Sequence, residues 1–235
     1  MNILIPDTSS LINIHEVHIG RTHIIDILNQ LFDVQVSREI PHEIRRRRDK
    51  FGDYDKQMLQ FVRQARRYFP HEQDYENLIF NKFSPSGNRN KNRGERYNCA
   101  LALYLVRRQY AGQIIMLTDD MKAHRGLINW YQSQFKTVKT WTSLELLLHI
   151  YFVVFPKWSY DQAYSVLREV NALMDREKGM EDEEMEEIED EEMEEIENMK
   201  KKMMMKRLLK YRRYLMQLHD ILNTLPRTKK FRGEL

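Results

Sequence analysis

Acidic residues stand at four places where the chain passes from one expected element to the next. Asp7 follows the apolar run NILIP, and Asp119 and Asp120 follow the apolar run IIML and one threonine. Glu43 and Glu95 lie near the starts of two expected helices. In an open parallel sheet, ligands bind outside the carboxyl ends of the strands, so we expect these acids to converge on one edge of the sheet.

Carboxylates gathered in one cleft repel each other, and a fold has little reason to collect them unless a cation is bound. Mg²⁺ or Mn²⁺ fits best, because these ions prefer hard oxygen ligands and share their coordination shell with phosphate oxygens. Such an ion activates water for in-line attack and stabilises the departing oxygen. The residues alone therefore indicate metal-assisted phosphodiester chemistry.

Each acid also has a structural interpretation. Asp7, followed by Thr8 and two serines, could simply cap a helix, and Glu95 could complement a helix dipole. Glu43 is followed by four arginines and could be an ion-pair residue on a solvated face.

Basic residues flank two of the proposed ligands, as a cleft that guides phosphates would require. They follow Glu43 and precede Glu95, and those expected to contact RNA are Arg45, Arg46, Arg89, Lys91 and Arg93. The alternative is an ordinary soluble surface.

The elements expected up to residue 155 alternate between strand and helix, which indicates an α/β fold with a parallel sheet. Strands are expected at 2–6, 34–37, 114–117 and 137–141. Helices are expected after Asp7, at 22–32, from Pro41, through 58–69, and at 95–109, 122–131, 143–155 and 159–174.

Residues 156–235 form a predicted helical extension with opposite charges in two segments. Residues 181–197 hold 13 acidic residues and contain the exact repeat EDEEMEEI, whereas residues 200–213 hold eight bases and no acid. A basic helix is expected at 200–222. The acidic segment either folds back on that helix or is a solvated linker, and the sequence leaves both open.

The composition indicates where in the cell the protein is located. Cys99 is the only cysteine, so an intramolecular disulfide is impossible. No apolar run approaches the ~18 residues of a membrane span, and the first residues lack a secretory pattern. We expect a soluble cytoplasmic protein without a membrane partner.

Four segments resemble, in order and spacing, the acidic motifs of PIN-domain nucleases, including VapC-like toxin ribonucleases. They are NILIPDTSSLI, IPHEIRRR, NRGERYNCALAL and IIMLTDDMKA, and the resemblance covers residues 1 to about 145. It implies a PIN-like three-layer α/β/α sandwich with a central parallel sheet, here a nuclease domain over 1–155. The third motif departs from the family, because it carries Glu95 where aspartate is more frequent.

The resemblance also implies the roles of individual residues. Asp7, Glu43, Glu95 and Asp120 would be catalytic and metal-binding, with Glu39 a weaker contender for the second position. Asp119 is close enough to share or replace Asp120 as a ligand, while Thr118 would position the pair and Ser9 would support the site.

The implied activity is that of a metal-dependent endoribonuclease that leaves a 3′ hydroxyl and a 5′ phosphate, as in a toxin or defence effector. RNA would be the substrate, an antitoxin or other regulatory protein a partner, and a homodimer the common assembly of the family. Two alternatives remain: a non-catalytic PIN-like module that binds RNA or protein, and an acidic repeat that mimics nucleic acid and covers the basic cleft.

Overall fold

The computed structural model describes residues 1–15, 17–19, 21–51, 56–83, 87–89, 92–120, 127–155, 157–182 and 190–224. The chain divides into two compact units, Met1–Leu146 and Leu147–Leu235. The boundary expected at residue 155 thus falls within the second unit, and each unit is considered by itself.

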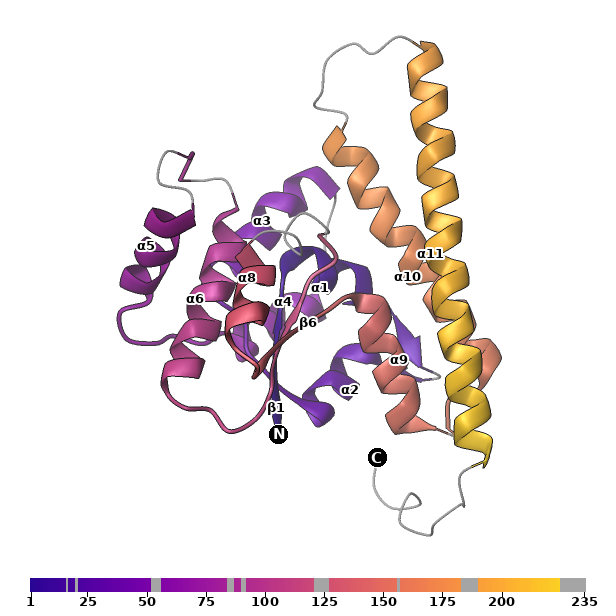
Figure 1. Ribbon diagram of the computed structural model, residues 1–235, viewed down its shortest axis with the longest axis horizontal. Coiled ribbons are helices and arrows are strands. Elements are labelled where there is room, and N and C mark those ends of the chain that lie inside the picture. Colours follow the sequence, from indigo (N-terminus) through magenta and orange to yellow (C-terminus); the bar gives the residue numbers. More distant parts are fainter. Residues whose placement is uncertain are drawn as a thin grey trace. The chain divides into compact units, whose positions relative to one another are not determined.

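A four-stranded parallel sheet lies at the centre of the first unit (Figure 1). It consists of β1 (Asn2–Pro6), β4 (Phe32–Val34), β5 (Ile114–Leu117) and β6 (Val138–Trp141), in the order β4-β1-β5-β6. Leu4 of β1 pairs with Val34 on one side and Ile115 on the other. The predicted α/β class with a parallel sheet is confirmed.

Helices flank this sheet because its strands are apolar on both faces. Ile3, Ile5 and Met116 pack on one side against a core that includes Cys99 and Ala100. Leu4 and its neighbours along the strands alternate to the opposite side and are also buried. The described helices of this unit are α1 (Thr8–His15), α2 (Ile24–Leu31), α3 (Ile40–Phe51), α4 (Lys56–Ala65), α5 (Glu72–Phe83), α6 (Arg93–Arg107) and α8 (Leu127–Gln134), and α9 (Ser143–Val154) begins in it.

Three details differ from the sequence-based expectation. The second sheet strand covers Phe32–Val34 rather than the expected 34–37, because Phe32 pairs with Asn2 and its side chain is buried. Helix α5 was not expected, and neither was the two-stranded antiparallel hairpin of β2 (His18–Ile19) and β3 (Thr22–His23). The expected strands at 114–117 and 137–141 agree closely with β5 and β6.

The second unit contains the rest of α9, α10 (Tyr160–Asp182) and α11 (Asp190–Thr224), and the last two pack side by side (Figure 1). Their contact includes the Asn171 Oδ1 atom, which accepts a hydrogen bond from Arg207 Nε at 2.6 Å. Tyr211 and Leu215 of α11 are buried. Within the described residues, no helix is long and apolar enough to cross a membrane.

Helix α11 joins the end of the acidic segment to the basic segment without a break. Residues 190–197 therefore cannot fold back on residues 200–213 of the same helix, as one of the two expectations for the acidic segment supposed. Residues 183–189 lie outside the described part of the chain, and so do the side chains of residues 175–197.

Candidate active site

Asp7 lies where β1 ends and α1 begins. Its backbone N–H donates to the Leu117 carbonyl of β5 at 2.9 Å, which fixes it beside the end of that strand. Its Oδ1 atom accepts hydrogen bonds from the Ser10 N–H at 2.7 Å and the Ser9 hydroxyl at 3.0 Å. Asp7 therefore caps α1 as the structural interpretation proposed, and this cap leaves Oδ2 available for a second contact.

Thr118 links Asp7 to the end of β5. The Thr118 hydroxyl donates a hydrogen bond to Asp7 Oδ2, and the same hydroxyl accepts one from the Asp120 N–H at 3.2 Å. The first and last acidic motifs are thus joined through one side chain.

The two aspartates after β5 differ in their surroundings. Asp119 is buried, and its carboxylate accepts from Asn13 Nδ2 at 2.8 Å, from the Ser143 N–H at 2.8 Å and from the Ser143 hydroxyl at 2.6 Å. Asp120 is exposed. Because both oxygens of Asp119 already accept hydrogen bonds, from Asn13 near the end of α1 and from Ser143 at the start of α9, the exposed Asp120 is the better candidate to contact a ligand.

Glu43 extends from α3 to two other helices. Its Oε2 atom accepts from the Thr8 hydroxyl at 2.5 Å, and its Oε1 atom accepts from the Gly94 N–H at 3.1 Å. Thr8 follows Asp7 in the chain and Gly94 precedes Glu95, so Glu43 holds together the segments that carry two other acids.

The alternative residue, Glu39, has a different environment. It is buried and forms ion pairs with Arg46 at 2.7 Å and with Arg93 at 3.1 Å. Two cations thus compensate its charge, which favours a structural role for Glu39 and leaves Glu43 as the acid of the second motif.

The electrostatics of the cluster show that its members interact. Burial raises the pKa of Asp7 to about 6; the hydrogen bond from Thr118 opposes this rise, and the charge of Asp119 adds to it. Burial raises the pKa of Glu95 to about 7, with further contributions from the charges of Asp120 and Asp7. A cation placed beside such carboxylates would stabilise their ionised forms.

Asn98 is a buried polar residue beside the cluster that the sequence reasoning did not select. It lies one turn of α6 after Glu95, and its Nδ2 donates to the carbonyl of Pro6, which precedes Asp7, at 3.3 Å. Its Oδ1 atom has no hydrogen-bond partner in the described part of the chain. A polar residue at helical spacing from Glu95, directly before the apolar stretch CALAL, was the signal available in the sequence.

These residues have the oxygen donors that a divalent cation prefers, but their side chains are not close enough together to bind one. The donors are carboxylate oxygens, and the charges of Asp120 and Asp7 contribute to the raised pKa of Glu95. Asn98 Oδ1 is a neutral oxygen acceptor without a partner among the described residues. Among the described residues, however, no group of three or more His, Cys, Asp or Glu side chains converges closely enough to hold a metal ion.

The basic residues expected to contact RNA differ in how they are engaged. Arg46 and Arg93 pair with Glu39, and Arg89 lies over the Phe80 ring at 5.0 Å. Arg45 is exposed and has no ion pair within the described residues. Lys91 lies outside the described residues.

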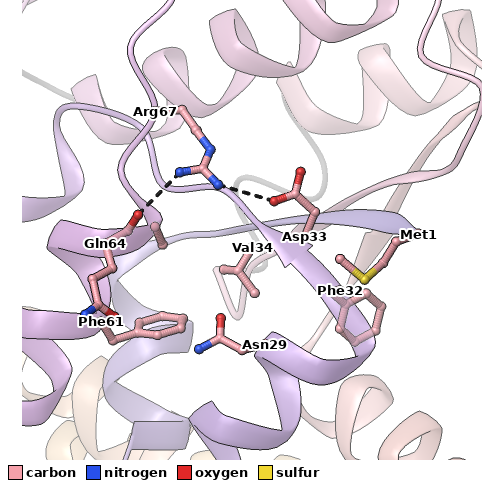
Figure 2. Close-up of a pocket in the computed structure, with 9 residues that line it drawn as sticks. Met1, Asn29, Phe32, Asp33, Val34, Phe61, Gln64 and Arg67 are labelled. Atoms are coloured by element: carbon pink, nitrogen blue, oxygen red, sulfur yellow. Dashed lines mark hydrogen bonds and ion pairs between the residues drawn. The ribbon is translucent and has the colours of Figure 1, made fainter.

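A pocket of about 300 Å³ lies elsewhere, beside the edge strand β4 (Figure 2). Met1, which precedes β1, lines it, whereas Asp7 follows β1, and five strand residues between them span about 16 Å. Asp33 is the carboxylate of its lining, and Arg67 Nη2 lies 3.4 Å from it. The pocket is therefore separate from the carboxylate cluster.

Comparisons with known proteins do not identify the chain. No protein-family model matches it, and no curated protein and no solved structure matches it either.

Proposed function

We propose that this protein is a metal-dependent endoribonuclease of the PIN type. The observation that carries the proposal is the Thr118 hydroxyl, which contacts the Asp7 carboxylate and the Asp120 backbone and so joins acids from two ends of the first unit. The raised pKa of Glu95, to which the charges of Asp7 and Asp120 contribute, adds the acid of α6 to the same cluster.

In this proposal Asp7, Glu95 and Asp120 would hold Mg²⁺ or Mn²⁺. When bound, the ion supplies an activated water and positive charge for phosphodiester hydrolysis. Glu43 holds the starts of α1 and α6 at a fixed separation through Thr8 and Gly94. Asp119 anchors the end of β5, because the start of α9 and the Asn13 side chain both donate to it.

The substrate side of the proposal rests on charge. Arg45 is exposed on α3, two residues after Glu43, where it can contact an RNA phosphate without first breaking an ion pair with a described residue. Arg46 and Arg93 would contribute to RNA binding while also compensating Glu39.

The direct test is incubation of the purified chain with RNA and Mn²⁺, followed by mapping of the cleaved ends. We expect internal cleavage that leaves 3′ hydroxyl and 5′ phosphate ends, is stopped by chelation and is lost in Asp7→Asn. Asp26→Asn is the matched control, because Asp26 is an exposed acid in the first turn of α2. Undiminished cleavage by Asp7→Asn would overturn the proposal.

The second candidate is a non-catalytic module of the same fold that binds RNA or a protein. It is favoured by the lack of a converged metal-binding group among the described residues. Calorimetry separates the two: RNA binding that survives chelation, together with no heat of Mn²⁺ binding, supports the non-catalytic module.

A further inference from the structure

Two arginines from different elements lie against the ring of Tyr97 in α6. The Cζ atoms of Arg38 and Arg93 are each 5.6 Å from the centre of this ring, so they are separated by no more than twice that distance. The Tyr97 hydroxyl donates a hydrogen bond to Gln73 Oε1 at 2.7 Å, which fixes the ring. Tyr97 is 1% exposed, whereas both arginine side chains are 39% exposed. The two guanidinium groups are therefore held near each other and remain open to solvent.

The charge of Arg93 is only partly compensated. Its Nε atom lies 3.1 Å from Glu39 Oε2, and Arg46 Nη2 lies 2.7 Å from Oε1 of the same carboxylate. Glu39 carries one negative charge and cannot neutralise two guanidinium groups, which are both always charged. A positive charge therefore remains beside Glu39.

The charge of Arg38 is compensated less well still. Its Nη1 atom lies 3.8 Å from Glu72 Oε2, which is longer than either ion pair of Glu39. Burial raises the pKa of Glu72, and the charges of Arg38 and Arg66 both oppose this rise, so two arginines share this carboxylate as well. Like charges held near one another repel, and an anion bound between them removes the repulsion.

The two guanidinium groups lie beside the carboxylate cluster. Arg93 and Gly94 are adjacent in the chain; Arg93 contacts Glu39, and the Gly94 N–H donates to Glu43. The Glu43 N–H donates to the Glu39 carbonyl at 3.0 Å, so these two glutamates are one helical turn apart, about 6 Å along the axis. A nucleic acid strand with one phosphate at the cluster can therefore place a neighbouring phosphate on the two arginines.

We propose that Arg38 and Arg93 together bind one phosphate of an RNA strand, next to the phosphate that meets the carboxylate cluster. A carboxylate has two oxygens in one plane and matches one guanidinium group. A phosphate presents oxygens in several directions and can accept from both arginines, which favours RNA over an acidic protein segment. Tyr97 fixes where the two groups lie. The identity of the strand as RNA rests on the ribonuclease proposal, whereas the phosphate chemistry rests on the arginines, of which the sequence reasoning did not select Arg38.

The test is the binding of a labelled single-stranded RNA to the full chain, measured by fluorescence anisotropy in chelator at several salt concentrations. Chelator prevents metal-dependent cleavage, so binding is measured by itself. Arg38→Gln should lower the affinity about tenfold, because hydrogen bonds to a charged group are lost. It should also reduce the slope of log affinity against log salt by about 0.7, the value for one contact with a single-strand phosphate.

Two further variants separate a phosphate contact from a general effect of charge. Arg38→Lys keeps the positive charge and should keep the wild-type salt slope, but it lacks the planar fork and should lose part of the affinity. Arg38→Gln/Arg93→Gln should lose less affinity than the product of the two single losses, because both side chains contact the same phosphate.

Arg107→Gln is the matched control. Arg107 also belongs to α6, and its Cζ atom likewise lies 5.6 Å from the centre of a tyrosine ring, that of Tyr75. It lies at the opposite end of the helix, about 21 Å from Arg93. Arg107→Gln should keep the affinity and the salt slope of the wild-type chain, with circular dichroism confirming that all variants fold.

Wild-type affinity and salt slope in Arg38→Gln would overturn the proposal, and so would an equal loss in Arg107→Gln. A wild-type chain that binds no RNA at about 50 mM salt would overturn it as well. If that chain instead binds polyglutamate in a manner that depends on Arg38, the pair belongs to an acidic protein partner.

The phosphate site and the ribonuclease proposal can fail separately. Metal-dependent RNA cleavage in a chain whose RNA binding is unaffected by Arg38→Gln would overturn the phosphate site alone. RNA binding that depends on Arg38, in a chain that cleaves no RNA with Mn²⁺, would support the phosphate site and overturn the ribonuclease proposal.

Discussion

The Glu43 carboxylate lies directly against the backbone of Gly94. A Cβ atom at Gly94 would be 2.3 Å from Glu43 Oε1 and 2.6 Å from its Cδ, so no larger residue fits while Glu43 keeps this position. The Gly94 N–H donates to the same carboxylate at 3.1 Å. The residue before Glu95 thus decides where the acid of the second motif can lie.

Gly94→Ala should displace the Glu43 side chain and reduce RNA cleavage at least about tenfold, since misplacement of a positioning group by about 1 Å can cost up to 100-fold. Stability should change little, because the higher helix propensity of alanine, up to about 1 kcal/mol in a helix interior, opposes the loss of the Gly94–Glu43 hydrogen bond. Steady-state cleavage and thermal unfolding measure the two effects.

Gly112→Ala is the matched control for this substitution. A Cβ at Gly112 would also be crowded, at 2.7 Å from the Tyr110 ring, but it lies before β5, at the far end of that strand from Asp120. It should cleave RNA at the wild-type rate. Equal activity of both glycine variants would show that the position of Glu43 does not matter for cleavage.

Asp7→Asn should stabilise the metal-free protein at neutral pH. The pKa of Asp7 is raised from 3.8 to about 6, so the unfolded state ionises first as the pH rises. The fold therefore loses stability between about pH 4 and about pH 6 and carries the full loss above that range. Asparagine keeps an oxygen for Ser9 and Ser10 and carries no charge. We expect a gain of about 1 to 2 kcal/mol at about pH 7.5.

Denaturant unfolding in chelator measures this gain, which should shrink as the pH is lowered towards about 3, where the Asp7 carboxyl is largely protonated in both states. The exposed Asp26→Asn variant should show no comparable gain. A loss of stability in Asp7→Asn at about pH 7.5 would mean that the cap of α1 matters more than the buried charge.

Asp119→Asn should mainly reduce stability, whereas Asp120→Asn should mainly reduce cleavage. The buried Asp119 carboxylate accepts three hydrogen bonds. In Asp119→Asn the side-chain NH₂ would face one of these donors instead of accepting from it, at a cost of about 1 to 3 kcal/mol in stability. Asp120→Asn should leave stability nearly unchanged and abolish cleavage. Unfolding and cleavage assays on both variants decide between them, and a cleavage defect limited to Asp119→Asn would make Asp119 the ligand.

The fold class could be predicted from the sequence because β1 and β5 are short apolar runs that end in polar residues. The start of β4 could not, since Phe32 also fits the helical pattern of the residues before it, and pairing with Asn2 decides its place. Helix α5 could not be predicted either, because a contact with another helix stabilises it. It is joined to α6 by the buried ion pair between Glu76 and Arg96, with 2.6 Å between the charged atoms, and no local pattern reveals such a contact.

The candidate acids could also be selected from the sequence, whereas their separate roles could not. Asp119 and Asp120 are adjacent and identical in type, and they differ only because Asn13, 106 residues away, and Ser143 donate to Asp119. Asn98 and Gly94 likewise gain their importance from side chains of other elements. Strand ends can be read from apolar runs, but the partners of a buried polar group depend on the assembled fold.

Glu95 should make Mn²⁺ binding depend on pH near neutrality. A carboxylate must lose its proton to bind a metal, and the pKa of Glu95 is about 7, so at about pH 5.5 only a few per cent of the metal-free protein has Glu95 ionised. We expect the apparent affinity to fall at least about tenfold between about pH 8 and pH 5.5. Calorimetry in buffers of different ionisation enthalpy should show proton release on binding near pH 6.5.

Glu95→Gln should bind Mn²⁺ more weakly and move the midpoint of the pH dependence towards the pKa of Asp7, about 6. Glu95→Asp, which carries the acid more frequent in the resembling family, should retain the proton release, and a pH-independent affinity in the wild-type chain would remove Glu95 from the metal site.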